Sequence, residues 1–167
     1  VGSLITLFSL VVLAGCARDD EAELKAHLST WFALEETEYF VSKKRCTAAI
    51  YKVAKVPLKP ALVVQRSPED AVTAFRTGKV AAVFMNQYSP NDIADAMLLA
   101  GDGAFGKEAL HASARAVDCL QGTLAEGYLR VALTRTGALL AYDKESEGVM
   151  VVDHVQMRLF YVAGAVL

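Results

Sequence analysis

Asp153 and His154 are the pair of residues best suited to acid–base chemistry in this chain. A carboxylate can orient an imidazole as a general base, and a serine or threonine beside the imidazole would supply a nucleophile. Adjacent residues of a strand point to opposite faces, so the two side chains can cooperate only if the backbone turns there. The competing interpretation is a turn with a polar tip.

The chain has three histidines, His27, His111 and His154, and no two of them have the spacing of metal ligands. A zinc site would need at least three ligands gathered from distant segments. We therefore predict no metal and no cofactor. We expect His27 and His111 to face solvent.

Gly101, Gly103 and Gly106 form the one G-x-G-x-x-G pattern of the sequence. A dinucleotide-binding loop must leave a strand, whereas these glycines follow the helical run from Ile93 to Ala100. The pattern therefore favours a connection between two helices.

An uncharged apolar run from Leu4 to Leu13 precedes the first cysteine. It has the length of the hydrophobic region of a signal peptide and is too short to span a bilayer as a helix. The next residues, Leu13-Ala14-Gly15-Cys16, resemble the lipobox of bacterial lipoproteins. The other interpretations are a buried apolar helix, or an ordinary cleaved leader followed by a cysteine.

The lipobox resemblance implies a signal peptide over residues 1–15 and a mature chain, 16–167, that forms a single periplasm-facing globular domain. It implies that the Cys16 sulfur carries diacylglycerol and palmitate-type acyl chains, which anchor the domain to membrane lipid. Ala17 is not the aspartate that retains lipoproteins in the inner membrane of some bacteria, which favours the outer membrane.

With Cys16 used for lipid, Cys46 and Cys119 remain. In an oxidising periplasm two remaining cysteines are expected to pair. We predict a disulfide between them, against the alternative of two independent buried thiols.

The amino-terminal half of the mature chain predicts two helices and several strands. Leu24, Leu28, Trp31 and Phe32 form one stripe of a helix expected over residues 19–38. A buried strand is expected over 46–53. Residues 61–85 read as strand, helix, strand, with the helix starting at Ser67-Pro68 because serine caps and proline suits the first turn.

The same Ser-Pro start recurs at Ser89 and predicts a helix that ends near Gly101. Two further helices are expected, over 106–120 and 123–135. Their inward residues should be Leu110, Ala114 and Val117 in the first, and Leu124, Tyr128 and Ala132 in the second. The last third, with apolar runs at 138–142, 149–152 and 155–162, predicts a β-meander.

The expected fold is a single α+β domain, with a mixed or antiparallel sheet covered by four to five helices. The formal charge is only −2 and the cations are scattered, so nucleic acid is an unsuitable partner. An acidic group, Glu35, Glu36 and Glu38, precedes a basic one, Lys43, Lys44 and Arg45. Such a run is usually a solvated face, and the alternative is a patch that orients the domain on anionic lipid or on a partner.

These features lead to two hypotheses. The first is a non-catalytic lipoprotein that serves as an accessory, assembly or scaffolding subunit of a membrane-associated complex, with a protein partner in the envelope. The second is a small periplasmic hydrolase, or a ligand-binding module, with a pocket near His154.

Overall fold

Seven strands make up one sheet, in the order β1-β2-β7-β6-β5-β4-β3. The computed structural model describes residues 17–100, 106–108, 111, 114 and 116–164. The strands are β1 (Phe32–Ser42), β2 (Cys46–Leu58), β3 (Val64–Gln65), β4 (Val80–Val83), β5 (Leu139–Asp143), β6 (Gly148–Asp153) and β7 (Arg158–Gly164). The helices are α1 (Glu21–Leu28), α2 (Pro68–Thr77), α3 (Pro90–Ala100), α5 (Val117–Leu120) and α6 (Leu124–Thr134).

Every pair of neighbouring strands is antiparallel except β3 and β4, which are parallel and flank α2 in the sequence. This is the expected strand–helix–strand unit, and Ser67 caps α2 by accepting from the Asp70 amide. Strands β5, β6 and β7 form the expected meander. The predicted α+β class, a single compact domain with a mixed sheet, is confirmed.

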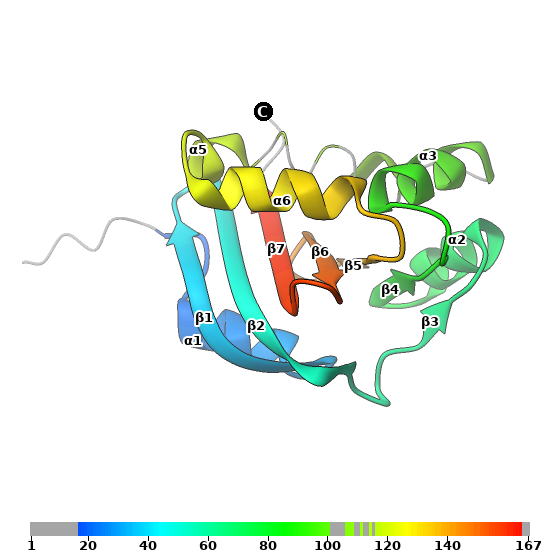
Figure 1. Cartoon of the computed structure of the whole chain (residues 1–167), viewed down its shortest axis with the longest axis horizontal. Helices are drawn as coiled ribbons and strands as arrows, with labels where there is room; N and C mark the ends of the chain where they lie inside the picture. Colours follow the sequence, from blue (N-terminus) through cyan, green and yellow to red (C-terminus); the bar gives the residue numbers. More distant parts are fainter. Residues whose placement is uncertain (1–16, 101–105, 109–110, 112–113, 115, 165–167) are drawn as a thin grey trace, which may run out of the picture.

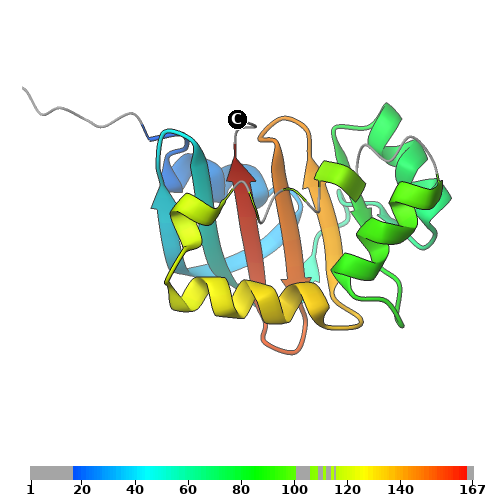
Figure 2. The same cartoon turned by 90° about the horizontal axis from the view of Figure 1, so that it is seen from above.

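Both faces of the sheet are buried. Because side chains alternate along a strand, Phe160 and Val162 of β7 pack on one face, while Leu159 and Tyr161 pack on the other. The first core contains buried residues of α2, α3, α5 and α6, and the second contains Leu24 and Leu28 of α1 with the same strands. Figure 2 shows α6 and α1 on opposite sides of the sheet.

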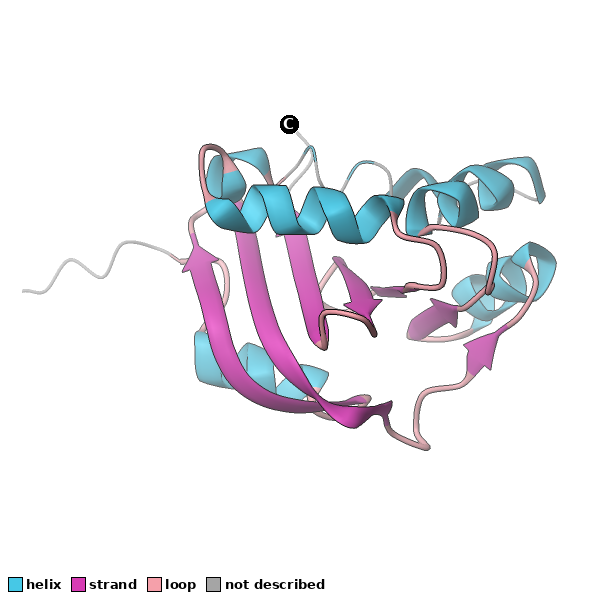
Figure 3. Cartoon of the chain, in the orientation of Figure 1, coloured by secondary structure: helices cyan, strands magenta, loops and turns pink. Residues whose placement is uncertain are grey.

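The long β1–β2 hairpin bends strongly, so that it curves away from the flatter central strands (Figures 1 and 3). The pairing of these two strands shifts register between Phe32 and Leu34, between Leu34 and Thr37, and between Thr37 and Tyr39. Such irregularities bend a strand and increase its twist. The bend accompanies the packing of Phe32 into the core beneath α1.

The expected helix over residues 19–38 is wrong beyond Leu28. Helix α1 ends there, and β1 begins at Phe32. Leu24, Leu28 and Phe32 are all buried in one cluster, as their spacing predicted, but Phe32 reaches it from a strand. Pairing with β2 along most of β1 outweighs the helical pattern, as tertiary context commonly does.

Helix α6 forms where expected, and Ala132 is buried as expected. In the first two turns, however, Ala125 and Leu129 are buried, whereas Leu124 and Tyr128, which were expected to point inward, are exposed. Leu124 and Tyr128 have the same spacing as Ala125 and Leu129, so the sequence offers two alternative apolar stripes there, and the second packs against the core. In the segment expected as a helix over 106–120, Ala114 is exposed rather than inward. Leu110 and the side chain of Val117 lie outside the described residues.

In both hairpins of the meander, an aspartate at the end of the first strand caps the turn that follows. Asp143 at the end of β5 accepts from the amides of Glu145 and Ser146, and Asp153 at the end of β6 accepts from those of Val155 and Gln156. Both carboxylates are buried. Aspartate favours such turns because its side chain replaces a backbone acceptor.

Gly148 at the start of β6 is required by close packing. A Cβ there would lie 2.2 Å from Cε2 of Tyr161, whose ring is fully buried and cannot move aside. We expect Gly148→Ala to lower the free energy of unfolding by about 1–3 kcal/mol, the usual cost of overpacking.

The matched control for this substitution is Gly127→Ala in α6, where a Cβ meets nothing within 4 Å. This change should be neutral or stabilise by about 0.5–1 kcal/mol. Urea unfolding of both variants measures the difference, and equal stabilities would contradict it.

Candidate functional site

Arg18 and Asp19, at the start of the described chain, are hydrogen-bonded to the rest of the domain. The backbone amide of Arg18 donates to the carbonyl of Lys43 at 3.2 Å, and its guanidinium donates to the carbonyl of Ser146 at 2.6 Å. The amide of Asp19 donates to Ser42 Oγ at 2.9 Å, and Thr47 Oγ1 donates to the Asp19 carboxylate at 2.5 Å. Cys16 lies outside the described residues. The domain therefore starts within two residues of the predicted lipid attachment site, with no spacer between them.

The turn between β1 and β2 carries Lys43, Lys44 and Arg45, all exposed. We call these three residues the basic turn. Lys43 Nζ donates to the carbonyl of Asp118. Lys44 and Arg45 have no hydrogen-bond or ion-pair partner within the described part of the chain.

Two of the three acidic residues that were expected to share a patch with the basic turn, Glu36 and Glu38, form ion pairs elsewhere. Glu36 forms an ion pair with Lys52 at 2.7 Å, and Glu38 with Arg158 at 2.6 Å, both across strands. The hydrogen bond and the charge of Lys52 lower the pKa of Glu36. The acidic side chains therefore lie along β1, apart from the basic turn.

Cys46 and Cys119 form the predicted disulfide, across a sequence separation of 73 residues. Cys46 begins β2 and Cys119 lies in α5, so the bond fastens this short helix to the sheet. Tyr39 supports the same junction, because its hydroxyl donates to the carbonyl of Cys119 at 2.6 Å. Both cysteines are buried.

His27 does not project freely into solvent as expected. Its Nε2 lies 2.7 Å from Oδ2 of Asp143, and the imidazole must donate because a carboxylate only accepts. Ser146 Oγ donates to the same carboxylate oxygen at 2.6 Å. Burial raises the pKa of Asp143, but the hydrogen bonds from Ser146 and His27 and from two backbone amides outweigh it, so this pKa lies below its ordinary value.

This cluster holds a histidine, an aspartate and a serine, but in the wrong order for a catalytic triad. In a triad the imidazole lies between the carboxylate and the nucleophile and takes its proton. Here Asp143 lies between His27 and Ser146, so the serine hydroxyl is bound to the carboxylate rather than activated. The arrangement instead ties α1 to the β5–β6 turn.

Asp153 and His154 do not act together in the way that base catalysis needs. The Asp153 carboxylate is buried, caps its own turn, and lies 3.0 Å from Arg135 Nε, a distance that makes an ion pair although the N–H does not point at the oxygen. The His154 ring packs edge-on with Phe84, with the ring centroids 6.0 Å apart. Burial lowers the pKa of His154, against the nearby charge of Asp153. These contacts fit the polar-turn interpretation.

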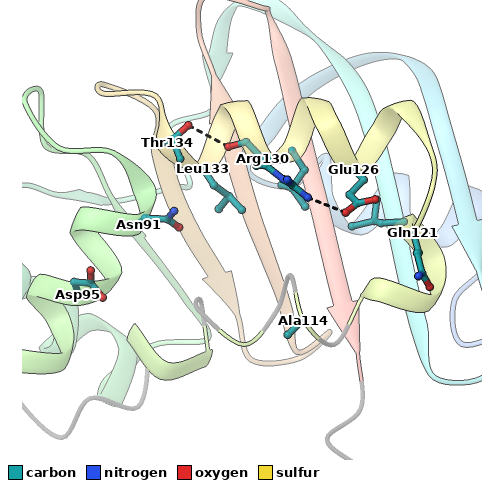
Figure 4. A pocket seen from close by; sticks show the side chains of 10 residues that line it. Asn91, Asp95, Ala114, Gln121, Glu126, Arg130, Leu133 and Thr134 are labelled. Atoms are coloured by element: carbon teal, nitrogen blue, oxygen red, sulfur yellow. Dashed lines mark hydrogen bonds and ion pairs between the residues drawn. The ribbon is translucent and has the colours of Figure 1, made fainter.

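A pocket of about 520 Å³ lies between α3 and α6 (Figure 4). Leu120, Leu129 and Leu133 give it apolar walls, and its polar lining residues are Asn91, Asp95, Gln121, Glu126, Arg130 and Thr134. Arg130 forms an ion pair with Glu126 at 3.0 Å, which neutralises part of the lining. The volume is within the range of small-molecule sites, about 300–1,000 Å³. His154 is not among these lining residues.

The remaining motifs give no further site. Gly106 begins a helical turn in which a Cβ would lie 2.4 Å from the carbonyl of Ala94, so it is needed for close packing against α3. Gly101 and Gly103 lie outside the described residues. Among the residues that the structure describes, no cluster of three or more histidine, cysteine or acidic side chains could hold a metal ion. No described helix is long and apolar enough to cross a membrane.

Comparison with known protein families, with curated proteins and with solved structures gave no match for this chain.

Proposed function

We propose that this protein is a lipid-anchored lipoprotein of the bacterial cell envelope, and that it serves as a non-catalytic accessory or scaffolding subunit of a membrane-associated complex. The observation that carries the proposal is the direct entry of the chain into the domain after Leu13-Ala14-Gly15-Cys16, with Arg18 and Asp19 already bonded to the fold. The disulfide between Cys46 and Cys119 supports an oxidising compartment such as the periplasm. Ala17 favours the outer membrane.

Acylation of Cys16 is the first test of this proposal. Cells grown with radiolabelled palmitate should yield a labelled protein, and mass spectrometry of the mature chain should find an acylated cysteine at its amino terminus. Cys16→Ala should abolish the label. Cys46→Ala should keep it, because lipid attachment does not depend on the disulfide. An unmodified Cys16 in the mature chain would exclude the anchor.

An exposed apolar stripe supports the accessory role. Leu124, Tyr128 and Val131 lie on one side of α6 with exposed fractions of 80%, 40% and 45%. Arg135, at the end of this helix, contacts Asp153, and Tyr128 lies beneath Arg158. Asp153 ends β6 and Arg158 begins β7, whereas the basic turn precedes Cys46, which pairs with Gly164 at the other end of β7. Figure 2 shows α6 crossing the sheet at the end opposite the carboxyl end of β7. On an anchored domain, the stripe would therefore face away from the bilayer, toward the part of a partner subunit that lies outside the membrane.

A photo-crosslinking amino acid at Val131 tests this surface. The matched control is the same amino acid at Val56, an equally apolar residue of β2 that is 74% exposed. We expect one defined protein adduct from position 131 and none of that mass from position 56. The same adducts from both positions, or none from either, would argue against a partner on α6.

A ligand-binding module is the second candidate, and the pocket between α3 and α6 favours it. Its apolar walls and polar lining suit a small amphipathic molecule better than the surroundings of His154 do. A stoichiometric small molecule retained in native mass spectrometry, together with no crosslink from Val131, would favour this candidate over the accessory subunit.

A further inference from the structure

We propose that the basic turn, Lys43-Lys44-Arg45, is a second membrane contact that binds the headgroups of anionic phospholipids beside the acyl anchor. This inference rests on the proposed acylation of Cys16. It adds that the domain has a fixed orientation, with the β1–β2 turn against the bilayer.

The position of the turn is the first argument. The Arg18 amide donates to the carbonyl of Lys43, so the start of the domain and the basic turn are bonded to each other. Cys16 precedes Arg18 by two residues, and two residues of chain span at most about 7 Å. An acyl group on Cys16 therefore brings the turn to the level of the headgroups. Figure 2 shows the start of the described chain, this turn and the carboxyl end of β7 at one end of the sheet.

The charge of the turn is the second argument. The whole chain has a formal charge of −2, yet three consecutive cations form the turn that is bonded to Arg18, two residues after Cys16. Three of the carboxylates on this side of the domain have partners of their own, while the exposed Asp118, whose carbonyl accepts from Lys43 Nζ, is the acidic residue that the turn touches. Asp19 pairs with Arg18 at 3.3 Å, and Asp20 accepts from the amides of Ala22 and Glu23 at the start of α1. Glu147 lies 3.9 Å from Arg18.

The rigidity of the turn is the third argument. The Lys43 amide donates to the carbonyl of Cys46 at 2.8 Å, and the disulfide begins at the residue that follows Arg45. Lys44 and Arg45 are therefore presented on a fastened hairpin, and each lacks a partner in the described part of the chain. A cation held near an anionic surface gains attraction from the surface potential, so this turn suits an anionic bilayer.

Lysine footprinting of the full-length, mass-verified lipidated protein tests the proposal. The protein is inserted into vesicles of POPC alone, or of POPC with about a quarter POPG, and acetylated briefly. We expect acetylation of Lys44 to be about fivefold slower in the POPG vesicles. The free energy by which an anionic surface attracts one lysine corresponds to a factor of about five in an equilibrium constant, so the lysine spends that much less time free to react. About 0.5 M NaCl should remove the difference by screening. Lys55, an exposed lysine toward the far end of β2, is the internal control and should react equally in both vesicles.

A charge-reversal variant separates headgroup binding from mere proximity. In Lys44→Glu with Arg45→Glu, the POPG-dependent protection should also disappear from Lys43, whereas Lys55→Glu should preserve it. Acylated protein whose Lys43 and Lys44 react equally in both vesicles would overturn the basic-turn contact and leave the anchor intact. Protection seen in native membranes but not in POPG vesicles would also overturn it, in favour of an acidic protein partner. An unacylated Cys16 would overturn both the anchor and this inference.

Discussion

Loss of the Cys46–Cys119 disulfide should lower the free energy of unfolding by about 4 kcal/mol. A bond that closes a loop of 73 residues restricts the unfolded chain by that amount in the chain-entropy model, and removal of native disulfides typically costs 2–5 kcal/mol. The effect should be seen as a fall in Tm of roughly 10 °C for a domain of this size. Helix α5 should loosen first, because the bond fastens it to β2.

Two comparisons separate the effect of the disulfide bond from the effect of the buried sulfur atoms. Cys46→Ala with Cys119→Ala removes the bond and also empties buried volume, since both cysteines are buried. The wild type unfolded with and without a strong reductant keeps the sulfur atoms and removes only the bond. Both comparisons should give a large loss, with the double variant the less stable. A difference below about 1 kcal/mol between oxidised and reduced wild type would contradict the expected stabilisation.

The parts of the fold that the sequence predicted are those set by local signals. Ser67-Pro68 and Ser89-Pro90 mark the starts of α2 and α3 because capping and the fixed φ of proline act within one turn of helix. The meander follows from apolar runs separated by short polar turns. The pairing of Cys46 with Cys119 followed from counting the cysteines that remained after Cys16.

The parts that could not be predicted depend on contacts between distant segments. Phe32 continues the helical spacing of Leu24 and Leu28, and only the partner strand β2 determines that it lies in a strand. On α6, two stripes have the same period, so only packing over the sheet shows which stripe faces inward. The pairing of His27 with Asp143 joins residues 116 apart. Neither residue has a local motif that identifies the other.

The candidate functional surfaces were predicted to different degrees. The sequence predicts one patch from the acidic-then-basic run, near the end of a helix, because the helical pattern continues as far as Glu38. In the structure Glu36 and Glu38 pair across strands, and the basic turn alone remains beside Arg18. The pocket between α3 and α6 had no sequence signal, since its leucines have the ordinary spacing of a buried helix face.

Asp143→Asn should lower the free energy of unfolding by about 3 kcal/mol at neutral pH. The carboxylate is fully buried and accepts from His27, from the Ser146 hydroxyl and from two backbone amides. An asparagine of the same shape keeps one acceptor oxygen and places an NH₂ group where a second acceptor is needed. Donors left unsatisfied in the interior cost about 1–3 kcal/mol each, and hydrogen bonds to a charged group are worth more than neutral ones. Asp95→Asn, on the exposed side of α3, is the matched control and should change stability by less than about 0.5 kcal/mol.

The same substitution should flatten part of the dependence of stability on pH. The folded pKa of Asp143 lies below 3.8, the ordinary value, so the unfolded chain binds this proton more readily than the native one. The stabilisation is therefore complete above pH 3.8 and is lost as the pH falls through the lower, folded pKa. Denaturant unfolding of the wild type and of Asp143→Asn between pH 7 and pH 3 should show a gap that persists to about pH 4 and then narrows. A gap that closes well above pH 4 would mean that Asp143 is protonated in the native protein, and that His27 is not held to an ionised carboxylate.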